Sequence, residues 1–132
     1  MKTTSILLLI AALMVGIPKL SAQEDTWKAP KYANDLKNPL KGDESAIADG
    51  KKIFNQMCAI CHGTKGKGNG AAGQSLDPKP SNFLSLNVRN ESDGTIFWKL
   101  TEGRPPMASY KDLLTENQRW MLVNYIRQLE NK

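Results

Sequence analysis

The sequence predicts an all-α domain of three to four helices arranged around one small site. Apolar residues recur at helical spacing in residues 44–61 and again in residues 115–130, and each stretch begins beside a residue that can cap a helix. No pattern of strands alternating with helices surrounds these stretches. A Cys/His cluster from Cys58 to His62 closes the first stretch and indicates where the site lies.

The first 22 residues have the pattern of a secretory signal. A lysine precedes an almost unbroken apolar run from Ile6 to Ile17, and the small residue Ala22 stands at the expected cleavage position. The run is short for a membrane span, which needs about 20 residues. We therefore expect export to the periplasm and no stable membrane insertion after cleavage, with an uncleaved anchor as the alternative.

Residues 23–43 are expected to form an extended N-terminal arm, and residues 44–132 the domain itself. The arm mixes Trp27, Tyr32 and two prolines with polar residues and has no sustained periodicity. It is either a partly disordered leader or a segment that packs along the domain or onto a partner.

The first helix is expected from Glu44 to Cys61, with Asp43 or Ser45 as its cap. Its apolar face contains Ile47, Phe54, Met57 and Cys61. Gly50 lies on the same face. Because glycine in a helix interior costs about 1 kcal/mol relative to alanine, we expect Gly50 to permit a close crossing with another helix.

Two further helices complete the predicted domain. A short apolar helix runs from Ser92 to about Thr101 and ends before Gly103. The last helix begins at Thr115, which can form a capping box with Gln118, and reaches Glu130. We expect this last helix to cross the first one, with Gly50, Phe54 and Tyr125 at the crossing.

The segment Cys58-Ala59-Ile60-Cys61-His62 is the attachment pattern of c-type haem. Each thiol can add to one vinyl group of the porphyrin, and two intervening residues in a helical turn bring the sulfurs to neighbouring pyrrole edges. The adjacent imidazole then lies below the iron as its proximal ligand. The chain contains no other cysteine or histidine.

Other readings of the cysteines fit less well. A thioredoxin-like dithiol needs a βαβ context. A structural zinc site needs about four ligands, and an iron–sulfur cluster usually needs four as well, whereas this chain offers three cysteine and histidine side chains. A plain Cys58–Cys61 disulfide would close a very small loop and constrain little.

The residues after His62 are expected to line one side of the site. Residues 63–70 are a glycine-rich loop without the spacing of a phosphate-binding loop. Residues 77–83 are extended by their prolines. A carbonyl of Pro78 or Pro80 is a candidate acceptor for the second ring N–H of His62, an interaction that would fix its tautomer.

The distal ligand is expected to be Met107. After signal removal the candidates are Met57, Met107 and Met121. Met57 lies on the proximal side, and Met121 belongs to an apolar helical face where methionine usually fills the core. Met107 lies in a proline-stiffened loop that can present its thioether from the opposite side, and an open or water-ligated iron is the alternative.

Taken together, these features resemble class I c-type cytochromes. The resemblance rests on motifs in order across residues 46–129: Gly50-x-x-x-Phe54, Cys58-x-x-Cys61-His62-Gly63, Gly66-x-Gly68-x-Gly70, Pro78-x-Pro80-x-x-Phe83, Asp93-Gly94-x-Ile96-Phe97-Trp98, Met107, and Arg119-Trp120-x-x-x-Asn124-Tyr125-Ile126-Arg127-x-Leu129. The chain departs from many relatives at Ala108, where they have proline. The resemblance implies a cytochrome c fold wrapped around one covalent haem c, with Met107 matching the distal ligand.

Several pocket and surface residues follow from this interpretation. The haem-pocket candidates are Pro80, Phe83, Trp98, Arg104 and Tyr110. Trp98 either donates its indole N–H to a haem propionate or simply packs in the core. Four lysines near the expected haem edge are candidates for docking acidic partners, although solubility is the simpler explanation for each of them: Lys65, Lys67, Lys79 and Lys111.

The sequence thus predicts a periplasmic single-electron carrier that is not itself an enzyme. Its partners would be redox proteins. The net charge of +5 comes without dense basic runs and does not indicate nucleic acid. The protein would be a monomer or a subunit. The alternative is a cytochrome subunit of a dehydrogenase, oxidase or quinol-oxidising complex, with the arm as its docking element. A haem enzyme or gas sensor with an open iron is a third reading.

Overall fold

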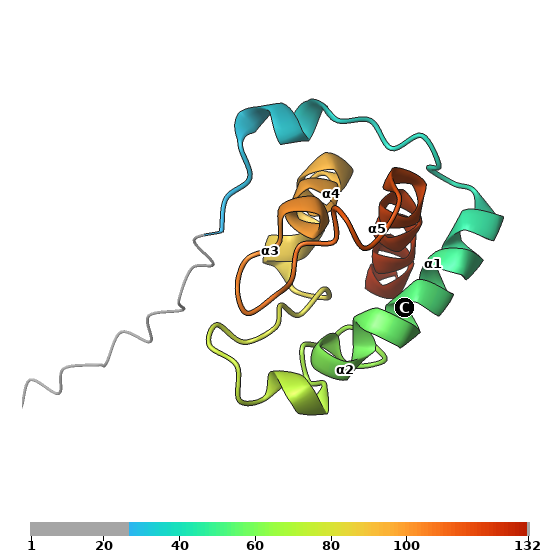
Figure 1. Cartoon of the computed structure of the whole chain (residues 1–132). Helices are drawn as coiled ribbons and strands as arrows, with labels where there is room; N and C mark the ends of the chain where they lie inside the picture. Colours follow the sequence, from blue (N-terminus) through green and yellow to red (C-terminus); the bar gives the residue numbers. More distant parts are fainter. Residues whose placement is uncertain (1–26, 132) are drawn as a thin grey trace, which may run out of the picture.

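The computed structural model describes residues 27–131, and the regular structure in this range is helical (Figure 1). Its elements are η1 (Lys31–Asp35), α1 (Glu44–Met57), α2 (Ala59–His62), η2 (Ala71–Gly73), α3 (Leu86–Arg89), α4 (Asp93–Glu102) and α5 (Glu116–Glu130). Within the described range, an isolated bridge between Arg104 and Met107 is the one β-type pairing. The predicted all-α fold class is confirmed. The predicted signal, residues 1–22, lies outside the described residues.

Helices α1 and α5 cross at Gly50, as the sequence predicts, and lie side by side in Figure 1. A Cβ added to Gly50 would lie 2.0 Å from the carbonyl oxygen of Met121, so only glycine permits this approach. Phe54 is fully buried at the same crossing, and its ring packs on Tyr125 with centroids 5.2 Å apart. The crossing therefore fixes the helix that leads to the cysteines.

The N-terminal ends of α1 and α5 have the predicted caps, whereas the C-terminal end of α1 differs from the prediction. The Asp43 carboxylate accepts from the backbone N–H groups of Ser45 and Ala46 at 2.8 and 3.1 Å, and Thr115 forms its capping box with Gln118. The first helix, however, ends at Met57 rather than Cys61. Cys58 keeps a right-handed conformation but with φ distorted to −111°, and α2 starts as a separate turn at Ala59.

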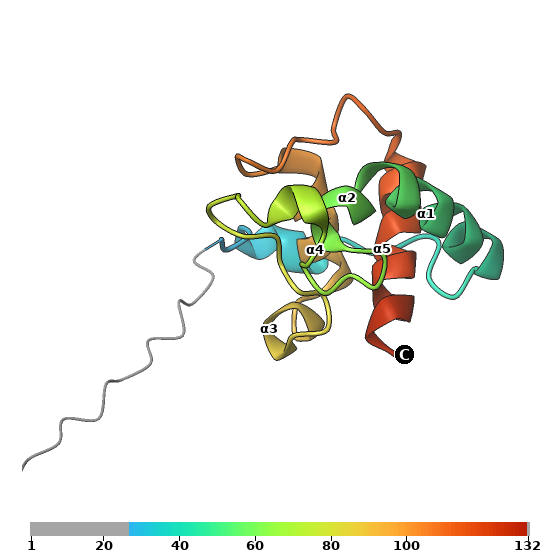
Figure 2. The same ribbon diagram turned by 90° about the horizontal axis from the view of Figure 1, so that it is seen from below.

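In residues 27–42, η1 packs on α4, where the blue segment lies in Figures 1 and 2, and the residues after it reach α5 through Asn124. Ala33 of η1 is fully buried, and its carbonyl oxygen would lie 1.9 Å from a Cβ added to Gly94. Leu36 and Leu40 pack against the hydrophobic core. Among the alternatives for this arm, the described part packs along the domain.

None of the helices in residues 27–131 combines the length and apolar character that crossing a membrane requires. The longest of them, α5, carries charged residues as well as its apolar face.

Candidate functional site

One pocket of about 260 Å³ brings together the predicted sulfur and nitrogen groups. Cys58, Cys61 and His62 reach it from the end of α1 and from α2, and Met107 reaches it from the loop after α4. The remaining lining is mainly apolar. It includes Phe54 and Ile126 from the α1–α5 pair and Ile96 and Leu100 from α4. Two thiols, an imidazole and the thioethers of Met57 and Met107 thus share one mainly apolar cavity.

The His62 ring is fixed in orientation by two contacts. Its Nδ1 lies 3.1 Å from the carbonyl oxygen of Ser81, and because a carbonyl can only accept, Nδ1 carries the proton. The ring stacks on Phe83 with centroids 4.5 Å apart and planes 14° apart. The Nε2 lone pair is therefore left for a metal. The acceptor is Ser81 rather than the predicted Pro78 or Pro80, so the expected segment was right but the residue was wrong.

Burial favours the neutral forms of Cys58 and His62. Burial lowers the pKa of the His62 imidazole, and the hydrogen bond to Ser81 offsets only part of that shift. Burial, and then the charge of Cys61, raise the pKa of the Cys58 thiol to about 12. Both cysteines are free thiols, so the disulfide reading of the pair does not describe this structure. A neutral imidazole is the form that binds iron.

Backbone hydrogen bonds hold the glycine loop against α2. Gly68 N–H donates to the carbonyl of His62 at 2.8 Å, and Gly70 N–H donates to the carbonyl of Cys61 at 3.0 Å. A Cβ on Gly70 would lie 2.4 Å from the carbonyl oxygen of Ile60, so the two backbones approach more closely than any other residue would allow.

The Met107 loop is held from both of the helices that flank it. Arg104 and Met107 exchange backbone hydrogen bonds of 3.0 and 2.7 Å, and Tyr110 N–H donates to the carbonyl of Leu100 in α4. From α5, the buried Arg119 guanidinium donates from Nη1 to the carbonyl oxygen of Leu114 at 2.6 Å and to that of Lys111 at 3.0 Å. The loop thus has a defined path toward the pocket.

Known proteins with similar sequences match this region. A family model described as cytochrome c oxidase, cbb3-type, subunit III, matches residues 45–126. The chain belongs to this family. It is therefore a c-type cytochrome domain, and the predicted cytochrome c fold and haem c cofactor are confirmed.

Two relatives extend the comparison. The cytochrome domain is 34% identical over 56 residues to the cbb3-type cytochrome c oxidase subunit FixP of Azorhizobium caulinodans, covering 42% of this chain and 19% of that protein. A solved structure of the Kuenenia stuttgartiensis reducing HAO-like protein complex superposes with a TM-score of 0.62 and 28% identity, over 71% of this chain and 49% of the other. The chain thus spans half or less of these relatives.

The pocket fits the haem c of the cytochrome domain. Covalent attachment needs two thiols, and a proximal ligand needs an imidazole with one free nitrogen. Cys58, Cys61 and His62 would offer these groups at one wall of the pocket. Met107 lines the same cavity and adds a soft sulfur donor. The mainly apolar lining suits a porphyrin face.

The structure brings most of the predicted pocket residues of the cytochrome domain together. Pro80, Phe83, Arg104 and Tyr110 line the cavity, and burial, with smaller contributions from the two cysteines, raises the pKa of Tyr110 to about 12. Trp98 differs from the expectation, because it is not among the lining residues and its indole N–H donates to the Tyr32 hydroxyl at 3.1 Å. Of the four lysines, Lys79 lines the pocket, and all four are exposed.

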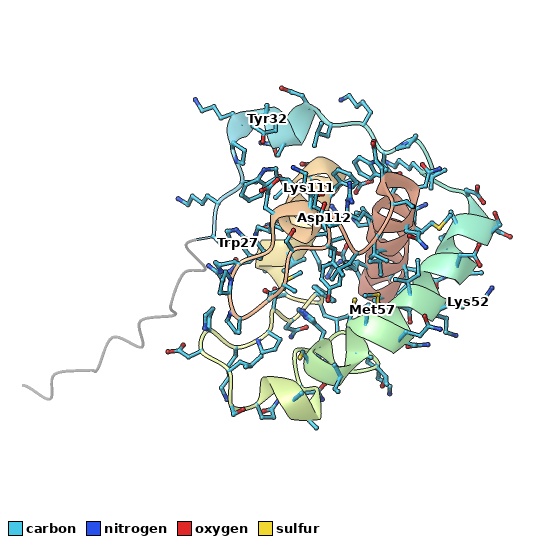
Figure 3. All side chains as sticks on the ribbon, viewed as in Figure 1. Trp27, Tyr32, Lys52, Met57, Lys111 and Asp112 are labelled. Atoms are coloured by element: carbon cyan, nitrogen blue, oxygen red, sulfur yellow. The ribbon has the colours of Figure 1, made fainter. Side chains whose placement is uncertain are left out.

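Sequence reasoning missed Trp27, which lines the pocket from the N-terminal arm (Figure 3). Its ring lies under the Arg104 guanidinium carbon at 4.7 Å and near the Lys99 ammonium at 5.2 Å. The one signal for this role was a large aromatic residue in an otherwise polar, aperiodic stretch. That signal cannot show which surface the ring covers.

Proposed function

We propose that this protein carries single electrons through one haem c bound by Cys58 and Cys61, with His62 and Met107 as axial ligands. The observation that carries the proposal is the convergence of these four side chains on one mainly apolar pocket. When bound, the haem supplies a reversible Fe(III)/Fe(II) couple, and a thioether ligand favours its reduced form.

The protein residues supply the rest of the function. Ser81 holds the His62 ring in the tautomer that leaves Nε2 free, and the hydrogen-bonded loop presents Met107. If His62 and Met107 both bind the iron, the haem would offer no place for O₂ or peroxide. His62 is also the single histidine of the sequence, so no second imidazole can serve as an acid or base. These features support a carrier rather than an enzyme.

The predicted export fits this role, because haem c is attached outside the bacterial cytoplasm in the family that the chain resembles. We therefore place the protein in the periplasm, with redox proteins as its partners.

Visible spectroscopy of the purified holoprotein tests the ligand set. We expect a sharp α band on reduction, and a weak absorption band near the red end of the ferric spectrum that marks the bond between methionine and iron. Met107→Ala should abolish the weak band, whereas the control Met121→Leu on α5 should keep it. An unchanged ferric spectrum in Met107→Ala would exclude Met107 as the ligand, and a reduced protein without an α band would exclude haem c.

A second candidate function is that of an electron-transfer subunit in a larger complex. The observation that favours it is that the relatives are named as an oxidase subunit and as part of a multi-protein complex. Purification from its native host at low salt would separate the two roles. A stoichiometric partner would support the subunit, and a monomer in every fraction would support the free carrier.

A further inference from the structure

Residues 27–42, which we call the N-terminal strap, are bound to α4 and α5 by side-chain hydrogen bonds. Asn34 Oδ1 accepts from the hydroxyls of Ser92 and Thr95, each at 2.9 Å. Farther along, Asn38 Nδ2 donates to Asn124 Oδ1 at 2.7 Å and to the Asp93 carboxylate at 3.2 Å. These bonds fix the strap along its length.

The strap also meets the domain through close backbone packing. Gly94 in the first turn of α4 permits the approach of the Ala33 carbonyl, which lies only 1.9 Å from where a Cβ on Gly94 would be. The Trp98 indole N–H donates to the Tyr32 hydroxyl at 3.1 Å, one turn farther along α4. The strap is therefore placed by the fold, and not by chance contact of a loose leader.

The first residue of the strap reaches the haem pocket. Trp27 is half-buried and lines the cavity together with Lys99 and Arg104. The Arg104 guanidinium carbon is 4.7 Å from the Trp27 ring centroid and the Lys99 ammonium is 5.2 Å from it, both within the range of cation–π attraction. Trp98 packs against Trp27 with centroids 6.4 Å apart. Trp27 thus has a fixed place at the pocket wall.

Three cationic side chains and one acidic side chain line this part of the pocket. Lys79, Lys99 and Arg104 line the pocket, and Glu91, which forms an ion pair with Lys99, is the one acidic residue among the lining. The ferric haem would carry one more positive charge than the ferrous haem. Exclusion of water would therefore disfavour the ferric form, because the more highly charged form loses more solvation.

We infer that the N-terminal strap is a built-in wall of the haem pocket, and that Trp27 raises the reduction potential by excluding water from the haem. This inference rests on the proposed function, since it concerns the haem couple. The strap precedes the residues matched by the family model, which begin at 45, so it is a feature of this chain beyond the matched domain.

Spectroelectrochemical titration of the haem-loaded, full-length protein tests the wall. We expect Trp27→Ala to lower the midpoint potential by at least the equivalent of a threefold change in the Fe(III)/Fe(II) equilibrium, and Trp27→Phe to restore most of it because an apolar ring remains. Gly94→Ala should also lower the potential, because it displaces the strap while leaving Trp27 in the sequence. The changes in midpoint potential caused by Gly94→Ala and Trp27→Ala should not be additive, because both substitutions expose the same side of the pocket to water.

Two controls separate this role from general destabilisation and from charge. Lys28→Ala changes an exposed neighbour of Trp27 and should leave the potential unchanged at 0.15 M salt, where surface charges are screened. Ile47→Ala weakens α1 packing away from the haem pocket, so it should lower the melting temperature without changing the potential.

Three results would contradict the inferred role of the strap or the proposed function. Midpoint potentials equal to that of the wild type in haem-loaded Trp27→Ala and Gly94→Ala would refute the inferred role of the strap. A midpoint potential in Ile47→Ala that is lowered as much as in Trp27→Ala would refute it too. If the wild-type protein itself holds no covalent haem, the proposed function is refuted, and the inference about the strap is refuted with it. If Trp27→Ala does not load haem, the Gly94→Ala potential decides the question.

Discussion

The Cys58–His62 segment and the Met107 loop face the same pocket, but different kinds of contact hold them. Cys58 N–H donates to the carbonyl of Phe54 and His62 N–H to that of Cys58, each at 2.9 Å, so the proximal segment is organised by neighbours along the chain. The Met107 loop depends on the flanking helices, through Leu100 in α4 and Arg119 in α5. Local hydrogen bonds therefore set the backbone of the proximal segment, whereas tertiary packing sets the distal loop and the orientation of the His62 ring.

This difference has a consequence for robustness. Helical turns with local hydrogen bonds keep their shape when distant contacts weaken, whereas a loop closed by long-range contacts opens first. The pocket should therefore lose the geometry of Met107 before it loses that of His62.

Loss of both thiols should remove the proximal attachment completely. In the double variant Cys58→Ala/Cys61→Ala we expect all haem to be extracted into acidified butanone, because no thioether bond can form. Ile60→Ala, at the exposed position between the two cysteines, is the matched control and should retain its haem in the protein phase. Retention of haem in the double variant would refute covalent attachment at these residues.

Gly50→Ala tests the crossing that supports the proximal helix. Alanine is favoured over glycine by about 1 kcal/mol in a helix interior, yet its Cβ would lie 2.0 Å from the Met121 carbonyl oxygen. We expect a net loss of roughly 2 kcal/mol in the free energy of unfolding, because backbone atoms must move apart. Urea denaturation measures it, with Lys51→Ala as the exposed control. A more stable variant would contradict the crossing.

Arg119→Met tests the distal loop separately. The substitution keeps an apolar stem in the core but removes the guanidinium bonds to the carbonyls of Lys111 and Leu114. We expect a loss of about 2 kcal/mol in the free energy of unfolding. Hydrogen exchange should show faster opening of residues 104–114 while residues 58–62 remain protected.

The matched control for Arg119 is Arg89→Met on the exposed end of α3, which should leave exchange unchanged. Equal loss of protection on both sides of the pocket in Arg119→Met would show that the two sides are not held independently.

The smallest effect concerns the ion pair that joins α4 to α5. Arg127 Nε donates to the Asp93 carboxylate at 2.8 Å. Burial alone would raise the Asp93 pKa, but hydrogen bonds from Arg127 and Asn38 together with nearby positive charge bring it below the ordinary 3.8. The ionised carboxylate therefore stabilises the fold at neutral pH, and this contribution is lost as the pH falls below 3.8 toward the folded-state pKa.

We expect Asp93→Asn to be less stable than wild type at pH 7, and the difference in unfolding free energy to shrink as the pH falls below 3.8. Urea denaturation at a series of pH values measures it. Asn90→Ala, an exposed substitution that removes no titratable group, should show a difference that does not vary with pH. A pH-independent difference for Asp93→Asn would contradict the role of the carboxylate.

Much of the α1–α5 framework could be predicted from sequence. The caps at Asp43 and Thr115 and the glycine at position 50 are encoded within a few residues of where they act, and each was found in its expected place. The break at Cys58 was not foreseen, because an apolar helical pattern continues through it without any breaking residue.

The remaining differences arise from contacts between distant parts of the chain. Trp98 and Trp27 are both large aromatics, and their sequence contexts do not show which of them lines the pocket. The path of the strap along α4 determines which tryptophan lines the pocket. The Tyr32 hydroxyl accepts the Trp98 indole N–H, whereas Trp27 lies at the cavity. Likewise, the path of residues 77–83 brings the Ser81 carbonyl to His62 in place of a proline carbonyl.

The sequence by itself determined the cofactor and the main helices, since thioether attachment and helix capping need residues only a few positions apart. Only the tertiary structure decided how the pocket is closed. The acceptor for His62, the hold of Arg119 on the Met107 loop and the place of Trp27 each join residues well apart along the chain or join separate elements. Such contacts depend on how helices pack, and packing is a property of the whole domain rather than of any local pattern.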